Sequence, residues 1–209
     1  MDKYKTTFES WNKVASLYEE HFMDLDLYND TYDVFCEAIE KAKPKILEIG
    51  CGPGNITKYM LSKRPDFDLV GIDIAPNMVE LAKKNNPKAI FRVMDSRNIE
   101  EFKTEFEGII CGFCIPYLSK SDCSKLIMDT KNLLSEKGIL YLSFMEGDYE
   151  QSGYQSGSSG DKVYFYYHDL ENIKTELSEN GFEIMNISHK DYTRKDGTNE
   201  IHTILIART

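Results

Sequence analysis

The sequence predicts an α/β fold: a mostly parallel β-sheet with α-helices on both faces, finished by an antiparallel hairpin. Two observations predict it. From residue 45 onward, short apolar runs alternate with helical patterns, and near the end two strand-like runs flank a polar turn. Strict alternation of strand and helix favours parallel strands, because each crossover lays a helix on the sheet. A length of 209 residues suits one such domain and is short for two.

Five apolar runs have the length and content of buried strands: residues 45–49, 68–74, 89–94, 107–113 and 138–144. Helical patterns lie between them, at residues 56–62, 76–84 and 120–134. Pro76 suits a first helical turn, where its missing amide hydrogen would have no partner. Gly138 and Gly181 follow helical patterns and are suited to end them.

The pattern changes after residue 160. An aromatic strand-like run at 163–167 precedes a helix at 170–180 and strands at 182–189 and 200–207. The polar segment 194–198 contains a glycine, so the last two strands should pair as an antiparallel hairpin. A parallel sheet that ends in such a hairpin is not the usual dehydrogenase plan.

The first forty residues predict a helical cap on the rest of the domain. Phe8, Trp11, Tyr18 and Phe22 recur at helical spacing, and a second aromatic helix follows at 28–35. Two interpretations stay open: a helix pair that covers a sheet edge, or a lid over a small-molecule pocket. We therefore expect one domain over residues 1–209, with a core at 41–209.

The charge balance limits the partners. Lys and Arg total 25 against 35 Asp and Glu, which gives a net charge of −10 and an isoelectric point near 5.0. Such a surface repels phosphate backbones and anionic membranes, so we expect neither as a partner. The first residues lack the apolar core of a signal peptide, and no apolar run has the length of a membrane span. We expect a soluble, cytoplasmic monomer or homodimer.

The cysteines and histidines predict neither disulfides nor a metal site. An odd count of five cysteines argues against a disulfide framework. Cys111 and Cys114 form a CxxC motif, but no second pair completes a zinc site and the motif continues an apolar run. Buried thiols are the better interpretation. The four histidines share no short spacing, so we expect no metal.

One stretch, residues 46–55, carries the chemistry. A buried strand leads into Gly50, Gly52 and Gly54 and then into a helix. Such glycines allow a tight turn and let a ligand approach the bare backbone, with helix N-terminal amides facing it. Asp73 closes the next strand, where a carboxylate can accept two hydrogen bonds from a ribose diol. A dinucleotide fingerprint would place its third glycine at position 55, which is an asparagine.

Glu48, the three glycines and Asp73 together resemble the class I S-adenosylmethionine-dependent methyltransferase family, of the small-molecule type. The resemblance covers residues 40–209 and includes the terminal hairpin. It implies a Rossmann-like, seven-stranded sheet, S-adenosyl-L-methionine as cofactor and S-adenosyl-L-homocysteine as product. The segment 11–18 also resembles the opening of quinone-type and other small-molecule methyltransferases.

The resemblance also implies roles for individual residues. The backbone of the glycine loop wraps the methionine part of the cofactor, Glu48 orders that loop from beneath, and acids that end two strands bind the ribose and the adenine amino group. Apolar and small residues flank the adenine ring, and the end of the fourth strand contacts the cofactor through its backbone. The residues concerned are Glu48, Gly50, Cys51, Gly52, Asp73, Ile74, Met94, Asp95, Ser96 and Cys111. Simpler roles stay open for three of them: Asp73 or Asp95 as a helix or turn cap, and Glu48 as a loop anchor.

No catalytic residue is predicted firmly. Methyl transfer needs alignment and exclusion of water, and needs a base only when the nucleophile must lose a proton. Segment 115–118 lacks the histidine that many relatives carry after the fourth strand. Tyr117 is a candidate for positioning a substrate, or else it packs. His168 is a candidate for a proton role, although a plain helix start is favoured. The Gly/Ser-rich loop 147–162 is a candidate lid.

We therefore expect a methyltransferase that acts on a small-molecule acceptor by in-line displacement. A non-catalytic module that binds S-adenosylmethionine is the first alternative. A nicotinamide-dependent oxidoreductase is the second, and the glycine spacing and the terminal hairpin disfavour it. The aromatic content hints at a flat or cationic acceptor.

Overall fold

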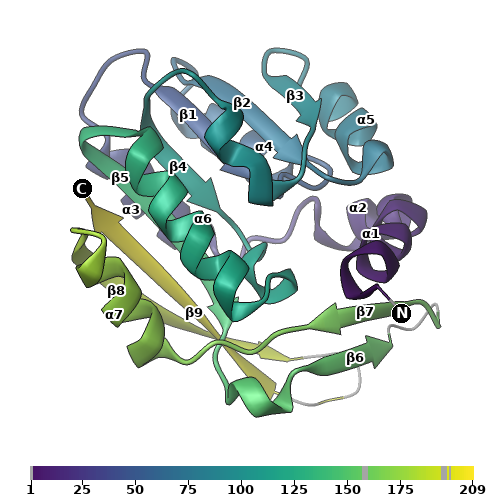
Figure 1. Cartoon of the computed structure of the whole chain (residues 1–209). Coiled ribbons are helices and arrows are strands. Elements are labelled where there is room, and N and C mark those ends of the chain that lie inside the picture. The colour runs from purple at the N-terminus through teal and green to yellow at the C-terminus, as the bar shows by residue number, and fades with distance from the viewer. Residues whose placement is uncertain (1, 157–159, 194–196, 198) are drawn as a thin grey trace.

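The chain folds around one seven-stranded sheet. The structure, a computed structural model, describes residues 2–156, 160–193, 197 and 199–209. The strand order is β3-β2-β1-β4-β5-β9-β8 (Figure 1). The first five strands in this order are parallel, and β9 runs antiparallel to both β5 and β8. The strands are β1 Lys45–Ile49, β2 Asp68–Asp73, β3 Ile90–Val93, β4 Phe106–Cys111, β5 Leu134–Met145, β8 Glu183–Thr193 and β9 Asn199–Arg208. The predicted fold class is confirmed, including the antiparallel end.

Helices cover both faces of the sheet, because its central strands are apolar on both sides. On one face α6 (Lys120–Leu133) and α7 (Leu170–Glu179) pack against a core that includes side chains of β1, β4 and β5. On the other face α3 (Asn29–Ala38) and α4 (Asn55–Lys63) bury the opposite side chains of the same strands. Helix α5 (Pro76–Asn85) packs beside β3 and begins with the expected proline.

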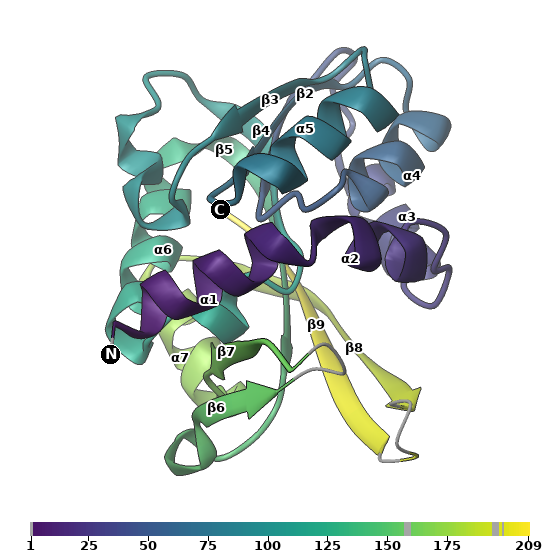
Figure 2. The ribbon, with the colours of Figure 1, turned by 90° about the vertical axis from the view of Figure 1, so that its right-hand side faces the viewer.

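The N-terminal region divides into two parts. Helices α1 (Lys3–Lys13) and α2 (Ala15–Phe22) lie across the edge where the parallel strands end (Figure 2). Helix α3 instead belongs to the core, since Phe35 is fully buried among sheet residues. The cap therefore consists of α1 and α2, and is shorter than the forty residues that the sequence predicts.

A small antiparallel ribbon stands where the sequence predicts a loop over 147–162. Strands β6 (Gly153–Ser156) and β7 (Lys162–Phe165) pair with each other outside the main sheet. The ribbon packs along α1: the Ser10 hydroxyl donates to the Lys162 carbonyl (2.6 Å), and the Tyr164 amide donates to the Thr7 hydroxyl (2.9 Å). Residues 157–159 of the Gly/Ser segment, and all but Gly197 of the predicted turn 194–198, lie outside the described residues.

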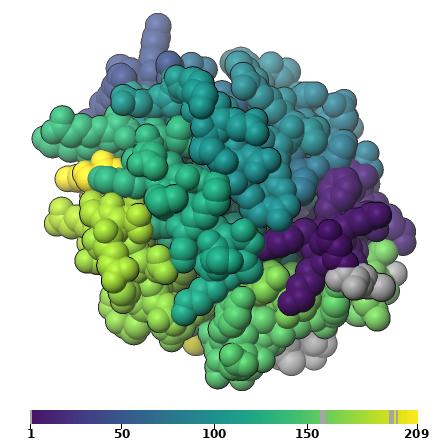
Figure 3. Space-filling view, viewed as in Figure 1, coloured from purple at the N-terminus to yellow at the C-terminus, as the bar shows by residue number. Residues whose placement is uncertain are grey.

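Helix α1 is fixed from three sides. Besides the ribbon, Asn12 accepts two hydrogen bonds from Asn77 at the start of α5. At its other end the Tyr4 hydroxyl donates to Asp122 and accepts from the Ser119 amide. In the space-filling view the helix occupies the gap between α5 and the ribbon (Figure 3). These contacts hold α1 in place above the ends of the parallel strands.

Two further findings bear on the expected classes of site. No helix of the described residues is long and apolar enough to cross a membrane. Within the same part of the chain, no three or more His, Cys, Asp or Glu side chains are grouped so as to hold a metal ion. Four cysteines are buried and Cys114 is half-buried.

Candidate active site

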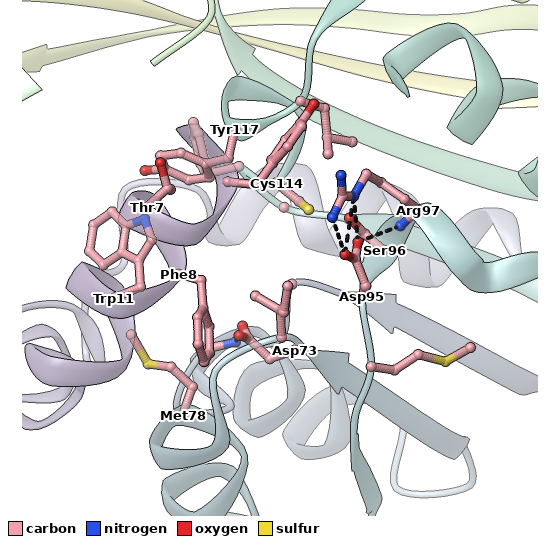
Figure 4. A pocket seen from close by; sticks show the side chains of 18 of the residues that line it. Thr7, Phe8, Trp11, Asp73, Met78, Asp95, Ser96, Arg97, Cys114 and Tyr117 are labelled. Atoms are coloured by element: carbon pink, nitrogen blue, oxygen red, sulfur yellow. Dashed lines mark hydrogen bonds and ion pairs between the residues drawn. The ribbon is translucent and has the colours of Figure 1, made fainter. Parts of the chain in front are cut away.

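Two adjoining cavities lie where the parallel strands end. The first, of about 150 Å³, lies between α1 and the ends of β1, β2, β3 and β4 (Figure 4). The second, of about 410 Å³, extends from there toward α3, β8 and β9. Seven residues line both cavities: Trp11, Tyr18, Gly50, Gly52, Gly112, Phe113 and Tyr117. The cavities therefore form one site with two lobes.

The glycine loop forms the floor between these lobes. Gly50, Gly52 and Gly54 all have positive φ angles, of 72°, 51° and 84°, which glycine adopts at little cost. A Cβ on Gly52 would meet nothing nearer than a Tyr18 ring carbon at 3.7 Å. Gly52 thus presents bare backbone to the cavity, as the sequence predicts for a loop that a ligand touches.

Gly54 is required by packing rather than by a ligand. It caps α4, and a Cβ there would lie 2.3 Å from the Asn86 side-chain nitrogen, which donates to the Gly54 carbonyl. We expect Gly54→Ala to lower the free energy of unfolding by about 2 kcal/mol, from positive φ plus the clash. Gly160→Ala is the matched control, with φ 78° and nothing near its Cβ, and should cost about 1 kcal/mol. Equal losses in urea unfolding would contradict this steric account.

Glu48 lies beneath the loop and is almost completely buried, with 1% of its surface exposed. The Thr57 hydroxyl donates to its Oε2, while Oε1 is buried with no hydrogen-bond partner among the described residues. Burial raises the pKa of Glu48 to about 8, so the carboxyl group is largely protonated at neutral pH. Glu48 is joined to α4 through Thr57 and does not line either cavity.

Asp73, at the end of β2, holds the segment before α5 and also lines the first cavity, while its ribose-binding role stays a prediction. Its Oδ1 accepts from the Ala75 amide (2.8 Å), just before α5, and its Oδ2 accepts from the Gly52 amide (3.0 Å). The carboxylate also lines the first cavity. Burial raises its pKa, and the two amide bonds oppose that shift. Each oxygen keeps a further lone pair for a ligand hydroxyl.

Asp95 caps the short 3₁₀ helix η1 (Ser96–Glu101) and pairs with Arg97. It accepts from the Arg97 amide (2.9 Å) and from the Arg97 side-chain Nε (3.0 Å). Burial works to raise the pKa of Asp95, but the bonds from Arg97 together outweigh it and hold the pKa below its ordinary value. The Arg97 guanidinium in turn lies 4.0 Å from the centre of the Tyr4 ring. Asp95 still lines the first cavity, now with Arg97, which the sequence analysis did not single out.

The other predicted cofactor residues divide into two groups. Ile74, Met94 and Ser96 line the first cavity, and their contacts with a cofactor stay a prediction. The thiols of Cys51 and Cys111 do not: Cys51 packs with residues of α5 and β3, and Cys111 is fully buried in the core. After β4 the cavity wall is formed by Gly112, Phe113 and Cys114, one to three residues beyond the predicted position.

The N-terminal helices α1 and α2, for which the sequence allowed two interpretations, supply an aromatic wall of the site. Phe8, Trp11 and Tyr18 line the first cavity, so α1 and α2 cover a pocket and not merely an edge. Trp11 makes edge-to-face contacts with Tyr18 and Tyr117, both at 5.5 Å between ring centres. Its indole N–H is buried without a hydrogen-bond partner among the described residues, which leaves a donor for a ligand.

The two candidate catalytic residues have different outcomes. Tyr117, in the 3₁₀ helix η2 (Ile115–Tyr117), lines both cavities. His168 lines neither: it is 4% exposed, and its Nε2 donates to the Ile115 carbonyl (2.9 Å). Burial lowers its pKa. His168 lies just before Asp169, which caps α7, in line with the plain helix start.

The second cavity contains residues that the sequence analysis did not connect. Tyr28, Tyr192, Glu200 and His202 all line it. The Tyr28 hydroxyl lies 2.6 Å from His202 Nδ1, although 174 positions separate the two residues. No spacing rule links positions that far apart, so only the pairing of β9 beside β5 and the packing of α3 could reveal them.

Comparisons with known proteins agree with this geometry. Residues 46–138 match the family model described as a methyltransferase domain. A putative methyltransferase 235L of Invertebrate iridescent virus 6 is 29% identical, over 66% of this chain and 49% of that protein. A demethylmenaquinone methyltransferase of Thermotoga maritima is 26% identical, over 51% of this chain and 46% of that protein. The chain thus spans about half the length of these curated relatives.

Solved structures share the whole fold. Magnesium protoporphyrin IX methyltransferase from Synechocystis PCC 6803, with bound S-adenosylmethionine, has a TM-score of 0.71 at 17% identity and covers 100% of this chain and 97% of its own. A Burkholderia thailandensis 1,6-didemethyltoxoflavin-N1-methyltransferase has a TM-score of 0.72 at 14% identity, over 98% of this chain and 88% of its own. The family model over residues 46–138, the curated relatives, the strand order and the glycine loop together support a class I S-adenosylmethionine-dependent methyltransferase.

Proposed function

We propose that this protein transfers a methyl group from S-adenosylmethionine to a small-molecule acceptor. The observation that carries the proposal is the pair of cavities that meet at Trp11, Phe113 and Tyr117. The first cavity has the polar and apolar groups that an adenosyl cofactor needs. The second opens beside it and offers a separate space for an acceptor.

The described residues of the first cavity fit the cofactor. Asp73 lines the cavity and offers acceptor oxygens for the ribose hydroxyls, and Gly52 exposes backbone for the amino-acid part. Ile74 and Met94 offer apolar surface to the adenine, and Asp95 with Ser96 offers its edge a polar partner. Cys51 and Cys111 would contribute through the backbone only. When bound, the cofactor supplies an electrophilic methyl group on a sulfonium.

The chain contributes alignment and a dry site. Helix α1 closes the first cavity and is held by contacts to α5, α6 and the ribbon. In the proposed complex, the aromatic rings at the junction would shield from water the point where the two ligands meet. Ordering the reactants and removing water account for most of what an in-line displacement requires.

A small acceptor is favoured over a nucleic acid. A volume of about 410 Å³ is in the range of pockets for small ligands. Several similar proteins are named for small-molecule acceptors, among them a demethylmenaquinone methyltransferase. A tRNA N(3)-methylcytidine methyltransferase of Schizosaccharomyces pombe is also 27% identical over 77% of this chain. The net charge of −10 supports a small acceptor, because it opposes the binding of a polyanion.

The test supplies methyl-labelled S-adenosylmethionine with a cell extract separated into small-molecule, RNA and protein fractions. We expect label in the small-molecule fraction, and an Asp73→Ala variant should leave that fraction unlabelled. Label only in RNA or protein would overturn the acceptor class. Cofactor binding without transfer to any fraction would instead favour the non-catalytic binding module.

A further inference from the structure

Three polar side chains form a connected group in the second cavity. The Tyr28 hydroxyl lies 2.6 Å from His202 Nδ1, and His202 Nε2 lies 3.7 Å from Glu200 Oε2. Tyr28 precedes α3, whereas His202 and Glu200 are two residues apart on β9. All three line the cavity, and Tyr28 and His202 are each about 95% buried.

The direction of the hydrogen bond follows from the position of Glu200. Its carboxylate lies on the Nε2 side of the ring, which favours the neutral imidazole with its proton on Nε2. His202 Nδ1 then accepts from the Tyr28 hydroxyl, which stays protonated because burial raises the pKa of Tyr28. A carboxylate in that position stabilises the imidazolium that forms when Nδ1 takes up a proton.

Stacked rings hold the imidazole in place. Its ring lies nearly parallel to Tyr192, at 4.9 Å and 17°, and to Tyr28, at 5.9 Å and 14°. Phe113 contacts the rings of both Tyr28 and His202 at 5.0 Å between centres. Because Phe113 also lines the first cavity, the group lies close to the junction of the two lobes.

The remaining wall indicates the chemistry of the acceptor. No lysine or arginine is among the described residues that line the second cavity, so a carboxylate would find no cationic partner there. Most of the large side chains are aromatic and suit a flat, unsaturated ring. They are Trp11, Tyr18, Phe22, Tyr28, Tyr32, Phe113, Tyr117, Phe165 and Tyr192.

We propose that the second cavity binds a flat aromatic acceptor with a weakly acidic hydroxyl, whose proton Tyr28 receives while it passes its own proton to His202 Nδ1. This inference rests on the proposed function. Tyr28 is the catalytic residue, and Glu200 is a positioning residue that acts through His202. During methyl transfer the acceptor oxygen bonds to the methyl carbon, and the carbon–sulfur bond breaks with its electron pair left on sulfur. The proton of the acceptor hydroxyl moves to the Tyr28 oxygen as the Tyr28 proton moves to His202. His202 later releases its extra proton to water.

The test uses 4-nitrophenol as a probe, because its phenolate absorbs visible light and its phenol does not. The protein is saturated with S-adenosylhomocysteine and buffered below the probe's solution pKa. We expect binding to raise the ratio of phenolate to phenol about tenfold, the equivalent of one pKa unit. Tyr28→Phe and His202→Gln should abolish that rise. His189→Gln, on the exposed part of β8, is the matched control and should keep it.

The outcomes separate this inference from the proposed function. If S-adenosylhomocysteine binds but 4-nitrophenol does not, or binds without ionising, the assignment of a hydroxyl acceptor is wrong while the proposed function stands. A rise that persists in Tyr28→Phe would overturn the proton path. If S-adenosylhomocysteine itself fails to bind, the proposed function fails and the inference with it. 4-Nitroanisole, which cannot ionise, should bind without spectral change.

Discussion

Replacing Asp73 by alanine should weaken binding of S-adenosylhomocysteine about 100-fold. This loss corresponds to about 2–3 kcal/mol in total, the net contribution of two charge-assisted hydrogen bonds. The carboxylate borders the first cavity, and in the proposed complex it accepts from the ribose diol. It also accepts from the Gly52 and Ala75 amides, so its loss loosens the glycine loop and the start of α5. Calorimetric titration measures the change in affinity.

The control separates binding from folding. Asp68 begins the same strand at its far end and is exposed, so Asp68→Ala should leave the affinity unchanged. Asp73→Asn keeps one acceptor oxygen and should give an intermediate loss. Urea unfolding of each variant shows how much of the effect comes from the fold. An Asp73→Ala protein that is folded and binds within threefold of wild type would refute the ribose-binding role.

Replacing Glu48 by glutamine should change how stability depends on pH. Burial raises the pKa of Glu48 from 4.5 to about 8, so the folded protein holds a proton that the unfolded chain releases. Between these two values each rise in pH favours the unfolded chain. The stability associated with protonated Glu48 is therefore complete below pH 4.5 and is lost as the pH rises through about 8. Glutamine is neutral throughout and suffers no such loss.

The expected difference is large. Relative to wild type, Glu48→Gln should gain stability between pH 5 and pH 8, on the order of 4 kcal/mol across that range. Urea unfolding of both proteins at several pH values measures it, and the subtraction removes the titration of every other group. Thr57→Val, which removes the hydroxyl that donates to Glu48, should keep the pH dependence of wild type or steepen it. Parallel stability curves for wild type and Glu48→Gln would show that the carboxyl group is ionised in the folded protein.

Much of the fold could be predicted because local pattern specifies it. The apolar runs of β1, β2 and β4 are short, continuous and bounded by turns, which distinguishes buried parallel strands from helices. Strand β6 was not predicted, since its sequence Gly-Tyr-Gln-Ser has the composition of a loop. It is a strand because it pairs with β7, a tertiary contact that composition does not encode. Helix α3 likewise shares the aromatic pattern of the cap but packs in the core.

The candidate site likewise has one part that local sequence predicts and another that depends on tertiary contacts. Gly50, Gly52 and Asp73 lie in one strand–loop–helix–strand unit, so their meeting follows from local geometry. The group around His202 joins the residue before α3 to β9, the last strand, and no spacing in the sequence links its histidine to Tyr28. His168 follows the favoured interpretation, since it lies at the start of α7 and its Nε2 donates to the Ile115 carbonyl.

The most direct measurement for the whole account is calorimetric titration of the wild-type protein with S-adenosylmethionine, S-adenosylhomocysteine and NADH. We predict micromolar binding of both sulfur compounds and none of NADH. Binding of NADH instead would identify the glycine loop as a dinucleotide site and contradict the proposal that it binds S-adenosylmethionine. If neither sulfur compound binds, the first cavity is not a cofactor site, and the fold serves a function other than methyl transfer.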